Sequence, residues 1–367
     1  MIYKKEIDKA ISWLFKTQNK ENFGWSWVQN ISPNEQNTAE VVYAVSLFCD
    51  ILNDNQKLLI NEAVRKWLLI PSKHAVLTID WAWVGLALSE YAEHYEQYSP
   101  DFSKEFVCKD IKTCINSMLS LQNADGGWGD YKHDMSTTFR TAISIIFLEN
   151  QNQLRNDAIE KALDHAVKWL LQLQNEDGGF GNVLRSNLTQ NILAYYAGVE
   201  QEIVEGQYLS SLSATGYALW ALSCRNKYMY GREIDQAAEY LKNLNLSSGY
   251  EIFFEVGIRR GTLFTFRHFG AAWMGIGLLN SGKSKFYSDE IIRLIKHFLS
   301  LQDRTNGGFK CNDSSEVYTW SNCNALMFLR LAINAINDMN GLDYTDIIAQ
   351  YFLSRSQKEN FNSTPSS

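Results

Sequence analysis

The chain has 367 residues, of which 46% are apolar and 20% charged, and its formal net charge is −7. Its 11 Trp, 18 Tyr and 19 Phe supply enough apolar surface for a folded core, which excludes disordered, collagen-like and low-complexity classes. The acidic balance, with no Lys/Arg cluster beyond pairs such as Arg259-Arg260, argues against nucleic-acid binding, which requires a basic face.

Three further features indicate a cytoplasmic protein. The first residues are amphipathic and do not resemble a secretory leader. The longest apolar run, near 269–279, is much shorter than the ~20 residues of a membrane span. The six cysteines form no Cys-x-x-Cys pair and lie in apolar segments, so we expect buried reduced thiols in preference to disulfides or zinc ligands.

A short phrase recurs four times along the chain: a helix end with a glutamine, a glycine turn and an aromatic residue. Its glutamines and aromatics are Gln18 with Trp25, Gln122 with Trp128, Gln174 with Phe180, and Gln302 with Phe309. Two of the glutamines are 52 positions apart, and the gaps of 104 and 128 each leave room for one degenerate copy. These copies are found at 64–69 and 238–244, so the chain contains six units.

Each unit indicates an amphipathic helix, a glycine loop and an apolar helix. In the third unit, apolar residues of 111–121 recur at i, i+4, i+7 and i+8 and form one stripe. The second helices are apolar nearly all round, which predicts that they are buried on all sides. They are expected at 39–52, 79–92, 137–148, 214–224, 266–279 and 317–336.

Six buried helices inside six amphipathic ones predict an all-α fold, an (α/α)6 toroid with a central cavity. We expect one domain over residues 1–355, an insertion or lid at 182–207 and a disordered polar tail at 356–367. The glycine turns are expected to end the outer helices, with the glutamines bonded to backbone groups of adjacent helix ends.

The glutamine, the paired glycines and the aromatic residue of this phrase resemble the QW repeat of the squalene–hopene cyclase and class II terpene cyclase superfamily. Protein prenyltransferase β subunits share the repeat and the fold. The resemblance covers residues 1 to about 355 and implies an α/α toroid. It also implies an enzyme that cyclises isoprenoids by protonating an alkene or epoxide.

In class II cyclases the proton comes from the central aspartate of an Asp-x-Asp-Asp motif. The matching segment here is 134–140, where Ser136 stands at the position of the donor. A serine hydroxyl is too weak an acid, so the usual donor is absent, and Ser136 suits an N-cap. Asp134 and Asp80 are the candidate catalytic acids. Each could instead cap a helix, and Asp134 could also organise a phosphate site.

Metal sites of the related families have no counterpart in this sequence. The zinc ligands of prenyltransferases need Asp-x-Cys and a later histidine, where this chain has Thr319, and the magnesium motif Asp-Asp-x-x-Asp is missing. We therefore predict no metal site and no cofactor. Mg²⁺ could accompany a diphosphate substrate without a dedicated site.

Aromatic residues of the inner helices are the expected cavity lining, because their rings suit an isoprenoid chain and stabilise a cation. The candidates are Trp81, Trp83, Tyr217, Trp220, Trp273, Tyr318 and Trp320, of which about half should only pack the core. Arg140, Arg267 and His268 open inner helices and are candidates for binding a diphosphate, with ordinary salt pairing as the alternative.

The leading hypothesis is a terpene-cyclase-like enzyme, an isomerase or lyase, that cyclises a linear isoprenoid or its diphosphate. The alternative is a non-catalytic toroid that binds a lipid, a peptide or a partner protein. A prenyltransferase-β-like subunit without zinc and a carbohydrate-processing enzyme are weaker alternatives. The expected partner is a lipid-like small molecule, not nucleic acid, and peripheral membrane contact, a homodimer or a partner protein stay open.

Overall fold

The computed structural model describes residues 3–28, 31–69, 75–184, 186, 208–242, 251–257, 262–282, 288–311 and 316–338, with the backbone alone for 251–257 and 262–268. Most of the predicted insertion and the whole predicted tail lie outside these residues. Within them, no helix combines the length and the apolar character needed to cross a membrane.

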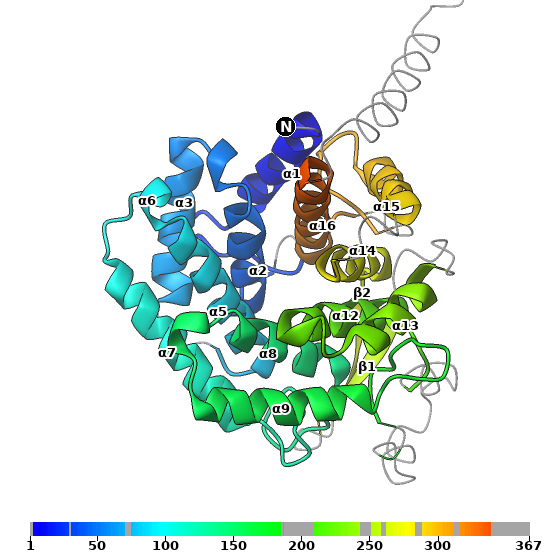
Figure 1. Ribbon diagram of the computed structural model, residues 1–367. Helices are drawn as coiled ribbons and strands as arrows, with labels where there is room; N and C mark the ends of the chain where they lie inside the picture. The colour runs from blue at the N-terminus through cyan, green and yellow to red at the C-terminus, as the bar shows by residue number, and fades with distance from the viewer. Residues whose placement is uncertain are drawn as a thin grey trace, which may run out of the picture.

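Six helices of the described chain form a closed inner ring (Figure 1). They are α2 (Glu35–Ser46), α5 (Thr78–Glu93), α8 (Thr138–Glu149), α12 (Leu212–Asn226), α14 (Gly270–Asn280) and α16 (Thr319–Asp338). Each contacts the next in this order, and α16 contacts α2. The ring confirms the predicted (α/α)6 toroid.

Amphipathic helices surround this ring and keep a polar face toward solvent. They are α1 (Lys4–Thr17), α3 (Asp54–Ala63) with the π-helical η2 (Val64–Leu68), α7 (Lys104–Leu121), α9 (Asp157–Leu171), α13 (Gly231–Lys242) and α15 (Ser288–Leu301). Three short elements lie in the connections: η1 (Cys49–Ile51), α6 (Tyr95–Tyr98) and η3 (Asn152–Leu154).

The repeat glutamines join neighbouring units. In each copy the amide nitrogen donates to a carbonyl of its own turn and to a carbonyl of the next outer helix in the ring. For Gln122 these are Gly126 O and Ala162 O, both at 2.8 Å. For Gln302 they are Gly307 O and Glu6 O, also both at 2.8 Å, so the last unit is bonded to the first helix. The predicted bonds to adjacent helices are confirmed.

The aromatic residue of each turn is held by its inner helix. The Trp128 N–H donates to Thr141 Oγ1 at 3.0 Å, and the Trp128 indole donates to Met118 O at 2.8 Å. The other three copies bond the aromatic N–H in the same way: Trp25 to Thr38, Phe180 to Thr215, and Phe309 to Asn322. Gly126 has φ +95° and a Cβ there would meet a carbonyl of the next unit, so this turn requires glycine.

The amino ends of the inner helices lie at one rim. Thr78 N donates to Asp130 O at 2.9 Å, Thr138 N to Asn182 O at 2.7 Å and Thr319 N to Trp27 O at 3.1 Å. Each bond joins the first residue of an inner helix to the loop before the following inner helix. Residues at these amino ends are therefore brought together around one end of the central space.

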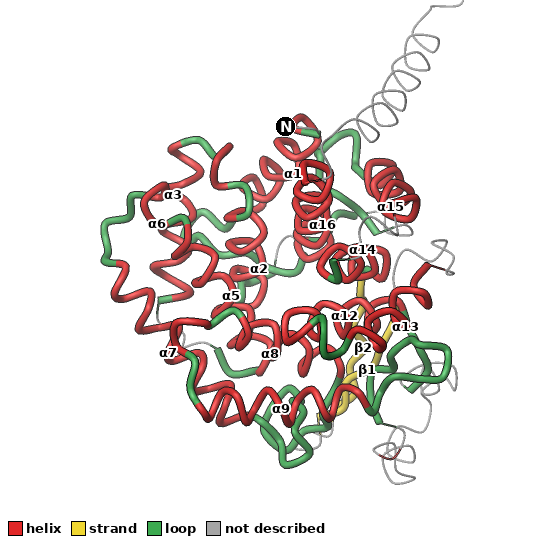
Figure 2. Tube along the Cα trace, in the orientation of Figure 1, coloured by secondary structure: helices red, strands yellow, loops and turns green. Residues whose placement is uncertain are grey.

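Two predicted inner helices have wrong bounds: the helix expected at 39–52 is α2, over Glu35–Ser46, and the helix expected at 266–279 begins four residues late. We expected it at 266, but 262–268 form strand β2 (Thr262–His268), paired antiparallel with β1 (Glu251–Gly257), and α14 begins at Gly270. These are the only strands among the described residues (yellow in Figure 2). The continuous aromatic and apolar residues of 262–268 fit a strand as well as a helix, so the pattern did not distinguish them.

Replacing Gln122 by leucine should remove its two hydrogen bonds to the partly buried carbonyls of Gly126 and Ala162. We expect the free energy of unfolding in urea to fall by about 2 kcal/mol. Gln172→Leu is the matched control, since Gln172 is exposed and its amide donates only to Lys168 O within its own helix. Equal losses in the two variants would contradict the role of the bridge.

Candidate functional site

The helix caps put the inner helices in a common register. The N-cap residues of α2, α5, α8 and α12 are Asn34, Leu77, Thr137 and Ser211. In α2, α8 and α12, the fourth residue after the cap accepts the N–H of the turn aromatic. Residues at equal distances after their caps therefore lie at similar depths in the ring.

One face of α2 carries partly exposed residues although the helix belongs to the inner ring, and we infer that this face borders the central space. Gln36, Tyr43 and Leu47 are partly exposed, whereas the residues between them are buried. Together with Glu40 they follow the spacing i, i+4, i+7 and i+11, which is one face of a helix. The other sides of α2 contact α5, α16 and α3. We call this central space, bounded by the inner helices, the lumen.

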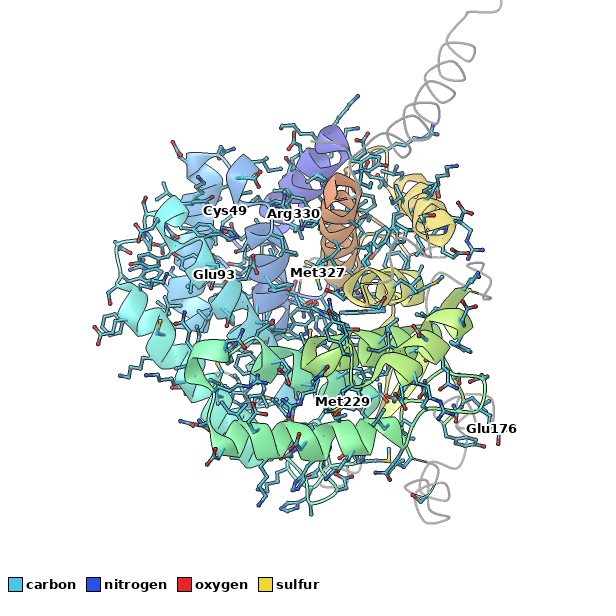
Figure 3. The ribbon with its side chains drawn as sticks, in the orientation of Figure 1. Cys49, Glu93, Glu176, Met229, Met327 and Arg330 are labelled. Atoms are coloured by element: carbon cyan, nitrogen blue, oxygen red, sulfur yellow. The ribbon has the colours of Figure 1, made fainter. Side chains whose placement is uncertain are left out.

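The same face can be followed on α16, where Trp320, Asn324, Met327 and Leu331 have the same spacing and both ends are partly exposed. Met327 and Arg330 project from α16 toward α2 (Figure 3). The Arg330 guanidinium lies 5.4 Å from the ring centre of Phe48 and 3.8 Å from the Asp50 carboxylate, so it is held at the carboxyl end of α2.

Several predicted lining aromatics lie in contact. Tyr217 stacks on Trp273 with ring centres 3.6 Å apart, and Trp273 also stacks on Trp220 at 6.2 Å. Phe139 meets Tyr217 edge-on at 5.5 Å. These residues come from α8, α12 and α14, so they form one continuous aromatic wall.

The other predicted aromatics lie on the facing helices. Trp83 of α5 meets Tyr43 edge-on at 5.8 Å. Tyr318 and Trp320 stack at 5.8 Å where α16 begins, and both are partly exposed. Trp81 is 8% exposed and Trp83 1% exposed, so both are buried. Aromatic contacts thus join α2 to α5, and α12 to α8 and α14.

Glu40 is a buried acid on this face of α2. It is the sixth residue after its cap, as are Trp83 in α5, Ile143 in α8 and Tyr217 in α12. It is 4% exposed, and its Oε1 accepts from Gln36 Nε2 at 2.8 Å. Its Oε2 is buried and has no hydrogen-bond partner among the described residues. Burial raises the pKa of Glu40 from 4.5 to about 7, against a lowering by the Gln36 bond.

Asp80 has a different position. It is the third residue after its cap, at the rim, and its Oδ2 accepts the N–H groups of Val76 at 3.1 Å and Leu77 at 2.9 Å. Burial raises the pKa of Asp80 to about 6, while these two bonds lower it. The carboxylate therefore caps the start of α5, which was one of its two expected roles.

Asp134 and Ser136 belong to the loop before α8. Asp134 is buried and its Oδ2 accepts the Tyr131 N–H at 3.2 Å. The expectation that Ser136 caps α8 is wrong, because Thr137 is the N-cap and accepts from Arg140 N at 3.3 Å. Ser136 instead donates to Asp125 Oδ1 at 2.9 Å.

The next unit has the same arrangement as Ser136. There Ser210 donates to Asp177 Oδ1 at 2.6 Å, and an asparagine amide donates to each serine. Ser136 is therefore a structural residue of the repeat. Its serine hydroxyl fixes the glycine turn, at the place where the resemblance to class II cyclases puts a proton donor.

A buried ion pair lies beside these acids. Arg140 is 1% exposed, and its Nε donates to Asp130 Oδ1 at 2.7 Å. The Asp130 carbonyl also accepts the first N–H of α5. The pair joins α5 to α8, and the binding of a diphosphate by Arg140 stays a prediction. Arg267 and His268 lie on β2, where only the backbone is described.

Among the described residues, no group of three or more His, Cys, Asp or Glu side chains could hold a metal ion. The six cysteines are all free, and four of them are buried, as expected of reduced thiols.

Comparison with known proteins gives the family. The family model of the α-macroglobulin TED domain matches residues 45–258, which is more than half of the chain. The chain belongs to this family. A search of curated protein sequences found no match.

Solved structures share the toroid. An inactive variant of an α-1,6-mannanase of glycoside hydrolase family 76 from Salegentibacter, in complex with α-1,6-mannotetrose, superposes with a TM-score of 0.64 at 11% identity, covering 91% of this chain and 99% of the mannanase. A family 76 mannanase from Bacteroides thetaiotaomicron superposes with a TM-score of 0.62 at 9% identity, covering 93% of this chain and 98% of the mannanase. A type II terpene cyclase from Scytonema superposes with a TM-score of 0.54 at 11% identity, covering 89% of this chain and 96% of the cyclase. The resemblance to class II cyclases is thus confirmed for the fold.

Two features of the site were not predicted. The sequence analysis did not single out Glu40 as a catalytic acid or Asp130 as a partner of Arg140. The repeat register would have revealed Glu40, because it replaces an aromatic or aliphatic residue at the lumen position of its unit. Nothing in the sequence pattern indicates the Asp130 pair.

Asp130→Ala should remove the carboxylate that pairs with the buried Arg140 guanidinium at 2.7 Å. We expect the free energy of unfolding to fall by about 3–5 kcal/mol. Glu62→Ala is the control, because it removes a pair with Arg65 at 2.6 Å that is partly exposed and should cost less than about 1 kcal/mol. A small loss in Asp130→Ala would show that the pair does not hold α5 to α8.

Glu40→Gln should change how stability depends on pH. Between pH 4.5 and about 7 the folded state binds a proton that the unfolded state has released, so this group makes stability fall across that window and level off above it. The variant should therefore gain about 3 kcal/mol relative to the parent between pH 4.5 and pH 8, measured by urea unfolding at both. Parallel curves for the two proteins would contradict a raised pKa of Glu40.

Proposed function

We propose that the protein is an enzyme of the terpene-cyclase type. It binds a linear isoprenoid or isoprenoid diphosphate in the lumen and cyclises it by acid-initiated carbocation chemistry, with Glu40 as the proton donor. The observation that carries the proposal is the Glu40 carboxyl on the lumen face, with its buried Oε2 unpaired in the described structure.

Neighbouring groups support this role for Glu40. Burial raises the pKa of Glu40 to about 7, so a substantial fraction of this carboxyl holds a proton to give at neutral pH. Burial chiefly, and then Glu40, raises the pKa of the Cys323 thiol on α16, which keeps that neighbour neutral. Trp83 and Tyr217 lie at the same depth on their helices, and an aromatic face turned to the substrate would stabilise a carbocation by ~1–2 kcal/mol.

The reaction needs no cofactor. The Glu40 carboxyl transfers its proton to a terminal alkene carbon, which forms a C–H bond and a tertiary carbocation and leaves a carboxylate. A second double bond of the chain then attacks the cation and closes a ring by forming a C–C bond. Loss of a proton from a carbon next to the final cation, back to a base in the lumen, restores an alkene. The product is an isomer of the substrate.

Other acids are less suited. The Asp80 Oδ2 accepts two backbone N–H bonds at the rim, and Asp134 lies in the loop before α8. Glycoside hydrolysis is also less suited. The inactive mannanase variant lacks two consecutive aspartates, and this chain has no Asp-Asp sequence.

A non-catalytic toroid is the second candidate. Ser136 has a structural role, and Ser210 has the same role in the next unit. This favours a non-catalytic toroid, because the position that holds the proton donor in class II cyclases is here a structural residue of the repeat. Such a protein would retain a ligand in the lumen without changing it.

The test incubates the purified protein with squalene and with geranyl, farnesyl and geranylgeranyl diphosphates, and identifies products by mass spectrometry. We expect a cyclic isomer of one substrate, formed at a rate that falls as the pH rises above about 7, because Glu40 then loses its proton. Glu40→Gln should lower the rate at least 100-fold by removing the general acid. Glu105→Gln, an exposed position on α7, is the matched control.

Recovery of unchanged isoprenoid bound to the protein, with no cyclic product, would favour the non-catalytic toroid. Full activity of the Glu40→Gln variant would overturn Glu40 as the donor.

A further inference from the structure

A cleft of about 580 Å³ lies where the ring closes, between α1 and the last glycine turn. It is lined by five basic side chains, one acidic one and three small or polar ones: Lys4, Lys5, Lys9, Lys16, Arg304, Asp8, Ser12, Thr305 and Asn306, with Gly307 at its base. This cleft lies on the outside of the toroid, on α1, which belongs to the outer ring (Figure 1).

The lysines of α1 follow a helical stripe. Lys5, Lys9, Ser12 and Lys16 are spaced at i, i+4, i+7 and i+11, so they share one face. At 1.5 Å per residue the stripe is about 16 Å long. Arg304 faces it from the turn across the cleft. The expectation that no Lys/Arg cluster exists is therefore wrong, because helical spacing joins residues that are separated in the sequence.

Most of these cations have no acidic partner in the described structure. Lys4 pairs with Asp8 at 2.7 Å. No described carboxylate lies within ion-pair distance of Lys5, Lys9, Lys16 or Arg304. The cleft therefore has an excess of positive charge on a chain whose net charge is −7.

We propose that this basic cleft binds an acidic peptide segment of a partner protein in an extended conformation. A five-residue strand spans about 16 Å, which matches the length of the stripe. Each lysine ammonium carries three hydrogen-bond donors and a positive charge, which a carboxylate side chain can accept and neutralise. The acidic remainder of the protein repels a long polyanion such as duplex DNA, or a flat anionic membrane, more than a short segment that stays within the cleft.

The test measures binding of a fluorescein-labelled hexaglutamate peptide to the full chain by fluorescence anisotropy. We expect binding in 50 mM salt that weakens at least tenfold in 300 mM salt. Hexaglutamine should not bind. The triple variant Lys5→Gln, Lys9→Gln, Lys16→Gln should bind hexaglutamate at least tenfold more weakly. The matched control is Lys109→Gln, Lys112→Gln, Lys168→Gln, which removes three exposed charges from α7 and α9 and should change affinity less than twofold.

Absence of hexaglutamate binding, or equal losses in the two triple variants, would overturn the proposal. Tighter binding of a ten-base-pair DNA duplex or of phosphatidylserine vesicles, lost in the cleft variant alone, would also overturn it, because the occupant would then be another polyanion. Retained fold in each variant is checked by thermal unfolding.

Discussion

The whole structure depends on the bonds that join each outer helix to the next. The repeat glutamine donates one hydrogen bond to its own turn and one to a carbonyl of the neighbouring unit. At the closing seam Gln302 bonds to Glu6 O, and Asn322 donates to Ala10 O at 3.0 Å. These contacts join residues 296 and 312 positions apart, and they close an array of helix pairs into a ring.

Ring closure gives the lumen its chemistry. An acid on the solvent face of an outer helix would be solvated, whereas Glu40 lies on the inner helix α2 and its pKa rises because burial removes water from the charged form. The acids of the rim differ, because backbone N–H groups or an arginine satisfy them: Asp80 caps α5 and Asp130 pairs with Arg140. The same ring thus holds structural carboxylates and one whose buried Oε2 has no partner in the described structure.

Much of the fold could be predicted from the sequence, because the repeat acts locally: glycine ends a helix, glutamine reaches the next backbone, and an all-apolar helix must be buried. The first residues of the inner helices were harder to predict. Residues 262–268 are aromatic enough for either a strand or a helix, and Ser136 and Thr137 are both good caps. Glu40 was not singled out from the sequence, because the motif of class II cyclases points to Asp134, whereas only the register of the helices distinguishes Glu40. The basic stripe on α1 was overlooked because its lysines are separated in sequence.

Toroids of this kind occur in mannanases and in terpene cyclases, so the fold alone does not select a reaction. The central claim is that the lumen holds a neutral carboxylic acid at Glu40. The most direct test is a pH titration of its side-chain carboxyl carbon by ¹³C nuclear magnetic resonance, with the signal assigned by its loss in Glu40→Gln. We predict a midpoint near 7. A midpoint near 4.5 would mean that the carboxyl is ionised and solvated, and would contradict the account.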